Sequence, residues 1–330
     1  MTAQNTWPGS AGDLGSPGSA NGAVITPEPG TTATPVATGT PTPQTGERWP
    51  LAAYAGPLQI DEVGFRGSDE EFVVLRNVND NAVSLDGWAV GDAERPGDGE
   101  GLYALPGDRV LAAGERFSIA RDATEFRAVY GHLPDAEIES SGAGVIVLER
   151  RLDLASGQLA LSDGGDEVVL LGPEATLVDG LAYKQGDAEA LDLTGTLSPE
   201  SSFSLQRVPN MSFDPDVDQR HRYLYARPSP FDSVSAPQTV TQPSPALAGG
   251  LSAVWGTLGA ASNFSDGYTA PPGYLLASAA AQGLHFAAVA DPAILGPLAD
   301  ISGITQIPAW RWSGEDGESA IVYSCLLYTS

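Results

Sequence analysis

The residues that decide the fold are EFVVLRN at positions 71–77, NDN at 79–81 and LDGWAVGD at 85–92. The first and last runs are rich in apolar and β-branched side chains, which favour strands, and the NDN between them is typical of a tight turn. Two such runs around a short turn predict two strands that follow each other closely in the chain. Trp88 comes directly after the Asp-Gly turn of the last run, and we expect it to be a core residue.

The same pattern of short strands and turn residues continues from Leu58 to about residue 231. The predicted strands are 58–60, 72–75, 88–90, 116–120, 145–148, 158–161, 167–171, 177–183 and 203–207. One helix is predicted at 123–130, with Asp122 capping its start and Gly131 closing its end. Many short strands with turn signals every 8–12 residues or so indicate an all-β sandwich.

An ordered series of short motifs in this region resembles a lamin-tail domain. The motifs are EV (62–63), EFVVLRN (71–77), LDGWAVGD (85–92), LPG (105–107), LAAGE (111–115), DEVVL (166–170), VD (178–179), SLQR (204–207) and RPSP (227–230). The resemblance covers residues 58 to about 231 of the predicted domain at 51–232. It implies an immunoglobulin-like β-sandwich, which bacteria use as an accessory module of surface proteins and secreted hydrolases.

The charge balance disfavours several classes of partner. Lys and Arg total 16 against 42 Asp and Glu, which gives a net charge of −26, and Lys184 is the one lysine. Such a surface repels nucleic-acid phosphates and anionic membranes, so we expect neither nucleic-acid binding nor membrane insertion. A soluble, acid-tolerant or salt-tolerant surface accounts for the charge. The more specific alternative is that some of the carboxylates bind calcium.

Both termini carry their own expectations. Residues 1–50 are rich in Pro, Thr, Gly and Ser, and we expect a disordered stalk that tethers an extracellular or cell-surface module. No signal peptide follows Met1, so the expected start lies upstream of this fragment. The terminal CLLYTS at 325–330, which contains the one cysteine, resembles a translated sequencing adapter, and we expect the natural chain to continue past Ser324.

A second region, 251–324, follows a Pro-Ser-Ala linker at 233–250. A strand at 253–258, a helix at 272–282 and a strand at 286–289 predict a parallel βαβ unit. Runs at 304–307 and 320–323 could supply further strands. A full β/α barrel needs about eight strands, so we expect a partial barrel fragment that is poorly soluble alone.

The framework of this region resembles the start of a PHP (polymerase and histidinol phosphatase) domain, through SNFSDG (262–267), AAAQGL (279–284) and AVAD (288–291). Members of that family bind two or three metal ions through histidines and carboxylates. The corresponding positions here hold Gly259, Ala261, Pro292, Arg311 and Ser319. Side chains without lone pairs, and a permanent cation, cannot hold divalent ions. The resemblance therefore implies a pseudoenzyme with no catalytic residues.

Two clusters remain as candidate sites. Asp214, Asp216 and Asp218 could bind calcium, although turn and capping roles explain them as well. The triplet Trp310-Arg311-Trp312 could stack on a sugar or a peptide aromatic, or could be a strand with its tryptophans in the core. His132, His221 and His285 are not at ligand spacing and are expected to be structural.

We therefore expect a non-catalytic, extracellular or cell-surface binding or scaffolding protein, with an unknown protein or glycan as partner and no cofactor except calcium. The alternative is a fragment of a secreted metal-dependent phosphoesterase of the PHP type, whose remaining ligands lie beyond the end of this chain.

Overall fold

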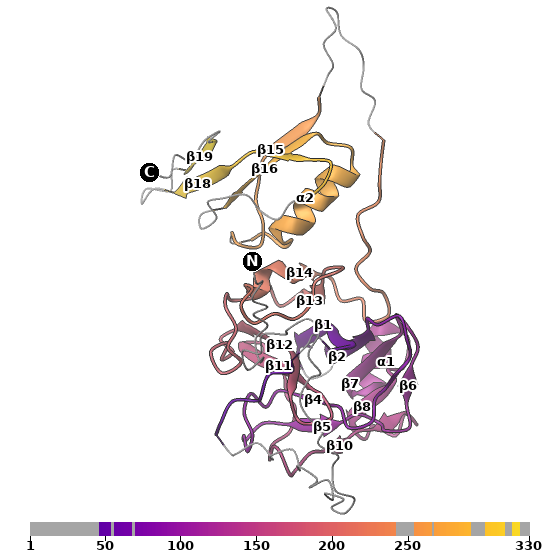
Figure 1. Cartoon of the computed structure of the whole chain (residues 1–330). Coiled ribbons are helices and arrows are strands. Elements are labelled where there is room, and N and C mark those ends of the chain that lie inside the picture. Colours follow the sequence, from indigo (N-terminus) through magenta and orange to yellow (C-terminus); the bar gives the residue numbers. More distant parts are fainter. Residues whose placement is uncertain are drawn as a thin grey trace, which may run out of the picture. The chain divides into compact units, whose positions relative to one another are not determined.

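The computed structural model describes residues 46–53, 56–67, 70–241, 254–265, 267–291, 301–313 and 319–323, which are coloured in Figure 1. The expected stalk up to residue 45, Pro292 and the terminal 325–330 lie outside these residues, as does the second half of the expected linker. The described part of the chain is mainly β, as predicted. It contains no helix long and apolar enough to span a bilayer.

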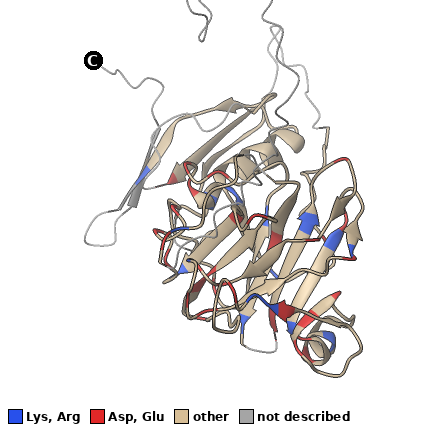
Figure 2. Ribbon diagram, turned by 60° about the horizontal axis from the view of Figure 1, so that its bottom comes forward, with Lys and Arg blue, Asp and Glu red and all other residues tan. Residues whose placement is uncertain are grey.

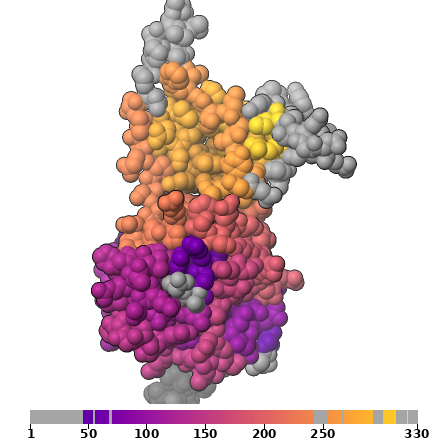
Figure 3. Space-filling model, turned by 180° about the vertical axis from the view of Figure 1, so that it is seen from behind, coloured from indigo at the N-terminus to yellow at the C-terminus, as the bar shows by residue number. Residues whose placement is uncertain are grey.

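The first sheet has seven strands. In sheet order they are β14 (Tyr223–Ala226), β13 (Ser204–Arg207), β1 (Leu58–Arg66), β2 (Glu70–Asn77), β7 (Arg116–Asp122), β8 (Ala136–Glu139) and β9 (Ile146–Val147). Pairing is antiparallel from β14 to β7, and β8 is parallel to both of its neighbours. Glu62 of β1 lies opposite Gln206 of β13, so a late strand pairs with the first one. Figure 3 shows indigo surface from the start of the described chain beside red-orange surface from the later part.

The second sheet has five strands. In sheet order they are β10 (Glu149–Arg150), β5 (Leu102–Ala104), β4 (Ala89–Gly91), β11 (Gly165–Leu171) and β12 (Leu177–Lys184). All its pairings are antiparallel. A small separate pair joins β3 (Val83–Ser84) to β6 (Val110–Leu111).

The two sheets share one core. Val63 and Val73 from the first sheet and Val168 and Leu181 from the second belong to a single cluster of buried apolar side chains. Because side chains alternate across a strand, each sheet can turn one face to this core. Trp88 lies in the same cluster with 6% of its surface exposed, which confirms that it is a core residue.

The predicted helix is confirmed as α1 (Ala123–Tyr130). The Asp122 carboxylate accepts the backbone N–H groups of Thr124 and Glu125 at 2.7 and 2.9 Å, and so satisfies two donors that the first turn leaves free. Gly131 ends the helix at φ 82°, a conformation that costs glycine little.

One predicted strand is wrong. Residues 158–161 form no strand, because side-chain carboxylates take the backbone donors that a ladder would use. The N–H of Ala160 donates to Asp92 (2.9 Å) and the N–H of Leu161 donates to Glu71 (3.3 Å). Several short strands, among them β5, β8 and β14, are not predicted, since runs of three or four residues show no clear period.

A buried ion pair joins the two sheets. Arg207 of β13 pairs with Asp179 of β12, and both side chains are almost completely buried. The Arg207 Nε also donates to the Ile60 carbonyl at 2.7 Å, while the Asp179 carboxylate accepts the Ile60 N–H at 2.8 Å. A buried pair needs such extra hydrogen bonds to offset the loss of hydration. The pair therefore fixes the position of β1 between strands of both sheets.

The region after the linker forms a separate small sheet. Its elements are β15 (Gly256–Ala260), α2 (Pro272–Ala281), β16 (Phe286–Asp291), β17 (Thr305–Gln306), β18 (Ala309–Ser313) and β19 (Ser319–Tyr323). β15 and β16 are parallel and α2 connects them, which confirms the predicted βαβ unit. β18 continues parallel to β16, but β19 returns antiparallel to β18. Within the described residues this sheet does not close into a barrel.

Candidate functional site

The loop at 92–101 and strand β11 bring three glutamates together. Glu94 and Glu100 lie on the loop between β4 and β5, and Glu167 lies on β11, which pairs directly with β4. One carboxylate oxygen from each lies within 4.8 Å of the others. In the part of the chain that the structure describes, this is the one group of three or more His, Cys, Asp or Glu ligand atoms at that spacing. These three residues (the glutamate cluster) could hold a metal ion.

Two aspartates beside the glutamate cluster hold its loop in place. Asp92 accepts the N–H of Gly101 at 2.7 Å and the N–H of Ala160 at 2.9 Å. Asp166 accepts the N–H of Ser162 at 2.9 Å. Both aspartates are buried and their oxygens are used by backbone donors, so they shape the site.

Burial and mutual repulsion favour the protonated form of these carboxyl groups. Burial raises the pKa of Glu100 to about 9, and the neighbouring Glu94 adds to this shift. Burial likewise raises the pKa of Glu167 to about 8, and the charge of Asp166 adds to it. The pKa of Asp92 rises to about 6, because burial outweighs its two backbone hydrogen bonds. At neutral pH the glutamate cluster therefore stabilises a bound positive charge, which either protons or a cation can supply.

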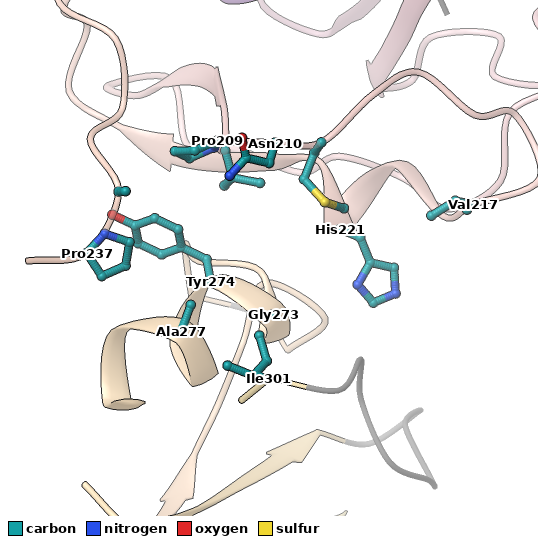
Figure 4. Close-up of a pocket in the computed structure, with 12 residues that line it drawn as sticks. Pro209, Asn210, Val217, His221, Pro237, Gly273, Tyr274, Ala277 and Ile301 are labelled. Carbon is teal, nitrogen blue, oxygen red and sulfur yellow. The ribbon is translucent and has the colours of Figure 1, made fainter. Parts of the chain in front are cut away.

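A second site is a cavity of about 650 Å³ within the unit formed by residues 41–330. Its lining is mostly apolar and comes from Val208, Pro209, Asn210, Met211, Val217, His221, Ala236, Pro237, Gly273, Tyr274, Ala277 and Ile301. Figure 4 shows Pro209 and Asn210 on one side, and Tyr274, Ala277 and Gly273 of α2 on the other. Burial lowers the pKa of His221, so its imidazole is neutral at neutral pH. Such a pocket suits a ligand with an apolar body.

The three aspartates predicted as a calcium site have local partners. Asp214 accepts the backbone N–H of Asp216 at 3.0 Å, and Asp218 pairs with Arg220 at 2.6 Å. Asp218 also caps the short 3-10 helix η1 (Gln219–His221). The three carboxylates do not form a group within 4.8 Å among the described residues. Calcium binding there stays a prediction without support from the geometry.

The predicted Trp310-Arg311-Trp312 triplet lies on β18. Trp310 and Arg311 are half-buried, and the Arg311 guanidinium lies 5.7 Å from the centre of the Tyr268 ring. The side chain of Trp312 lies outside the described residues. Binding by this triplet remains untested.

The positions singled out by the PHP resemblance have structural roles where they are described. Gly259 of β15 has φ 78°, and Ala261 is buried directly after that strand. Asp291 is fully buried and accepts hydrogen bonds from the hydroxyls of Ser262 and Ser265 at 2.7 and 2.6 Å. Pro292 and the side chain of Ser319 lie outside the described residues.

The predicted histidines also have neighbours. The ring of His132 packs against Phe231 and the ring of His221 against Phe264. His285 Nδ1 accepts the backbone N–H of Trp255 at 3.1 Å.

Sequence reasoning missed the glutamate cluster and the pocket. One signal for the cluster was present, since Asp92, Glu94, Asp98 and Glu100 place carboxylates at alternate or nearby positions of one loop. Figure 2 shows acidic positions in red on the loops that join the strands. The third member, Glu167, comes from a distant strand and has no signal in the sequence. The pocket combines segments from 208 to 301, and no local pattern marks it.

Comparison with known proteins identifies part of the chain. The model of the Lamin Tail Domain family matches residues 52–185. A DUF4876 family protein from Bacteroides thetaiotaomicron VPI-5482 is similar in structure, with 13% sequence identity and a TM-score of 0.35, over 52% of this chain and 68% of that chain. No curated protein matches the chain.

These comparisons give no support to the expected PHP domain at 251–324. The lamin-tail resemblance is confirmed over most of its range, and the match includes all three members of the glutamate cluster. Residues 52–185 of this chain therefore match the Lamin Tail Domain family.

Proposed function

We propose that this chain is a non-catalytic binding protein of the cell exterior, and that its pocket receives an apolar side chain of a partner polypeptide. The observation that carries the proposal is the pocket lining. Valine, proline, methionine, alanine and isoleucine supply most of it, and Asn210, His221 and Tyr274 supply the few polar groups. A cavity of about 650 Å³ with this composition is typical of a binding site for an apolar group.

The lining favours a polypeptide over a glycan. A sugar needs many hydrogen-bond partners when it leaves water, because each unpaired hydroxyl costs free energy. The Tyr274 hydroxyl already donates to the Ser235 carbonyl, at a long 3.4 Å, and leaves little for a sugar. The net charge of −26 also disfavours an anionic partner. A neutral or basic segment with a leucine or phenylalanine side chain fits both conditions.

The lining also favours binding over catalysis. The twelve residues that Figure 4 draws include no Ser, Thr, Cys, Asp, Glu or Lys. Nucleophilic catalysis needs a nucleophile within hydrogen-bond reach of its base, and His221 has no such neighbour among these lining residues. The exterior location and an immunoglobulin-like form of the sandwich are part of the proposal. The Thr-Pro-rich residues 32–45, the single lysine and the acidic surface support the location.

Methionine labelling tests the proposal directly. The chain has two methionines, Met1 and Met211, and Met211 lines the pocket. We expect blocked tripeptides with a central leucine or phenylalanine to shift the ¹³C-methyl resonance of Met211 saturably and to leave that of Met1 unchanged. A serine tripeptide and a neutral oligosaccharide should have no effect. The variant Met211→Leu assigns the signal.

A blocking variant and a matched control define the site. Ala277→Phe places a ring in the pocket and should abolish the shift, while Ala128→Phe on the exposed face of α1 should leave it unchanged. A response to the oligosaccharide alone would show that the partner is a glycan. Equal responses in the two variants would show that the peptides bind elsewhere and would refute the proposal.

A further inference from the structure

The three glutamates converge from two elements that the fold holds rigidly. β4 and β11 pair over three residues on each strand, which fixes the start of the loop against Glu167. Asp92, at the start of the loop, accepts the N–H of residue 101 at its end and the N–H of residue 160. The carboxylates of Glu94, Glu100 and Glu167 approach within 4.8 Å in a framework that holds them there.

The hydrogen bonding of the glutamates differs from that of the neighbouring aspartates. Asp92 and Asp166 accept several backbone N–H groups, which compensate their burial. The glutamates instead face other acids, because the carboxyl group of Glu94 lies within hydrogen-bond reach of those of Asp98 and Glu100, and that of Glu167 within reach of Asp166. The closest basic side chain along the loop, Arg95, pairs instead with Asp187 at 3.3 Å.

Burial makes this clustering of acidic groups significant. Glu167 is 4% exposed, and its carboxylate faces other carboxylates, among them that of Asp166. The Oε2 atom of Glu100 is buried and has no hydrogen-bond partner among the described residues. Ionised carboxylates that are buried without a partner are among the most costly features of a fold, so this cluster needs either bound protons or a bound cation.

We propose that Glu94, Glu100 and Glu167 bind one hard divalent cation of the calcium type. All the donors are carboxylate oxygens, which suit calcium or magnesium and are poor ligands for softer metals. Oxygens on opposite sides of a calcium ion lie about 4.8 Å apart at the usual ligand distance of about 2.4 Å. The spacing of these three oxygens is therefore that of ligands to a single ion. Three glutamates can supply up to about six oxygens, and calcium accepts six to eight.

Shared protons are the competing explanation. The raised pKa values of Glu100 and Glu167 show that protons can also neutralise the cluster. A proton relieves the repulsion but does not select an ion, so the two explanations differ in their response to calcium. This inference is independent of the pocket, and either can fail without the other.

Calorimetry with calcium chloride on the full, EDTA-treated chain tests the proposal. We expect one ion per chain, a Kd between about 10 µM and 1 mM, and weaker binding of magnesium, which dehydrates reluctantly. Calcium at about 100 times Kd should raise the melting temperature by about 5–10 °C through binding to the native state. Glu167→Gln should weaken binding at least tenfold.

Two further variants make the result decisive. Glu100→Gln removes a second ligand from the half-buried loop, and it should also weaken calcium binding at least tenfold if Glu167→Gln does not fold. Both glutamine variants should melt higher than the parent chain without calcium, because one repelling charge is removed. Asp216→Asn, which changes the acidic 214–218 segment, should bind calcium like the parent chain.

The absence of saturable heat and of a melting shift at 5 mM calcium would show that protons alone fill the cluster. A loss of binding in Asp216→Asn with retention in Glu167→Gln and Glu100→Gln would place the ion at the aspartates. An equal response of all variants would indicate only general screening of the acidic surface. Each of these results overturns the proposal.

Discussion

Trp88 shows how a single side chain connects the two sheets. It is 6% exposed within the core cluster that the strands of both sheets form. Trp88→Ala removes a large apolar side chain and leaves a cavity that the surrounding strands cannot fill, so the free energy of unfolding should fall by about 3–5 kcal/mol. Urea unfolding of the full chain, followed by circular dichroism, measures the change.

The control for this experiment is Leu152→Ala, because Leu152 is 67% exposed. That change should alter the free energy of unfolding by less than about 0.5 kcal/mol. A loss below about 1 kcal/mol for Trp88→Ala would show that the packing around this residue is not as the structure describes.

The burial of Trp88 was predicted from the sequence, whereas no prediction was made for Arg207. A tryptophan after an Asp-Gly turn in an apolar run has a local signal for burial. Arg207 has none, since an arginine at the end of a strand usually faces water. Its burial follows from Asp179 on another strand, and pairs of this kind depend on the tertiary fold.

At the scale of elements, α1 depends on its cap. Asp122→Ala leaves the N–H groups of Thr124 and Glu125 without their acceptor, and it should lower the free energy of unfolding by about 0.5–2 kcal/mol. Asp122→Asn keeps an acceptor oxygen and should cost less than the alanine variant. Chemical denaturation of the three chains measures both changes, and equal losses for alanine and asparagine would argue against the capping role.

The elements that the sequence predicted well are those with local signals. Helix α1 has a capping aspartate and a closing glycine, and α2 has a proline at its first position and a glycine after its end. The strand predicted at 158–161 was wrong for the opposite reason. Carboxylates from distant parts of the chain accept the backbone N–H groups that a β-ladder would use. The glutamate cluster was not predicted for the same reason. The acidic loop could be recognised in the sequence, but nothing local indicated that Glu167 lies beside it.

At the scale of the whole molecule, the buried acids predict an unusual pH dependence. Burial raises the pKa of Glu71 to about 7, that of Glu167 to about 8 and that of Glu100 to about 9, from 4.5 in each case. A raised pKa in the folded state means that the folded chain binds more protons than the unfolded chain between the two values. Their contribution to stability is therefore fully present below about pH 4.5 and is lost as the pH rises through these values.

We expect the melting temperature of the EDTA-treated chain to fall from about pH 4.5 to about pH 9. Scanning calorimetry at several pH values measures this, and Glu167→Gln should flatten the decline above about pH 6 because one such group no longer titrates. A melting temperature that rises towards pH 8 would show that these carboxyl groups are not buried as described. The negative composition alone predicted acid tolerance, but it could not locate the groups that cause it.

The pairing of β1 with β13 has a consequence for the synthesis of the protein on the ribosome. Glu62 and Gln206, whose side chains are hydrogen-bonded, are 144 residues apart, and ribosomes add about 5–20 residues per second. The translation of β13 therefore follows that of β1 by about 7–30 seconds. Throughout that interval one edge of the strand is open to chaperones and to other nascent chains. This exposure of the β1 edge ends when β13 has been synthesised and can pair with it.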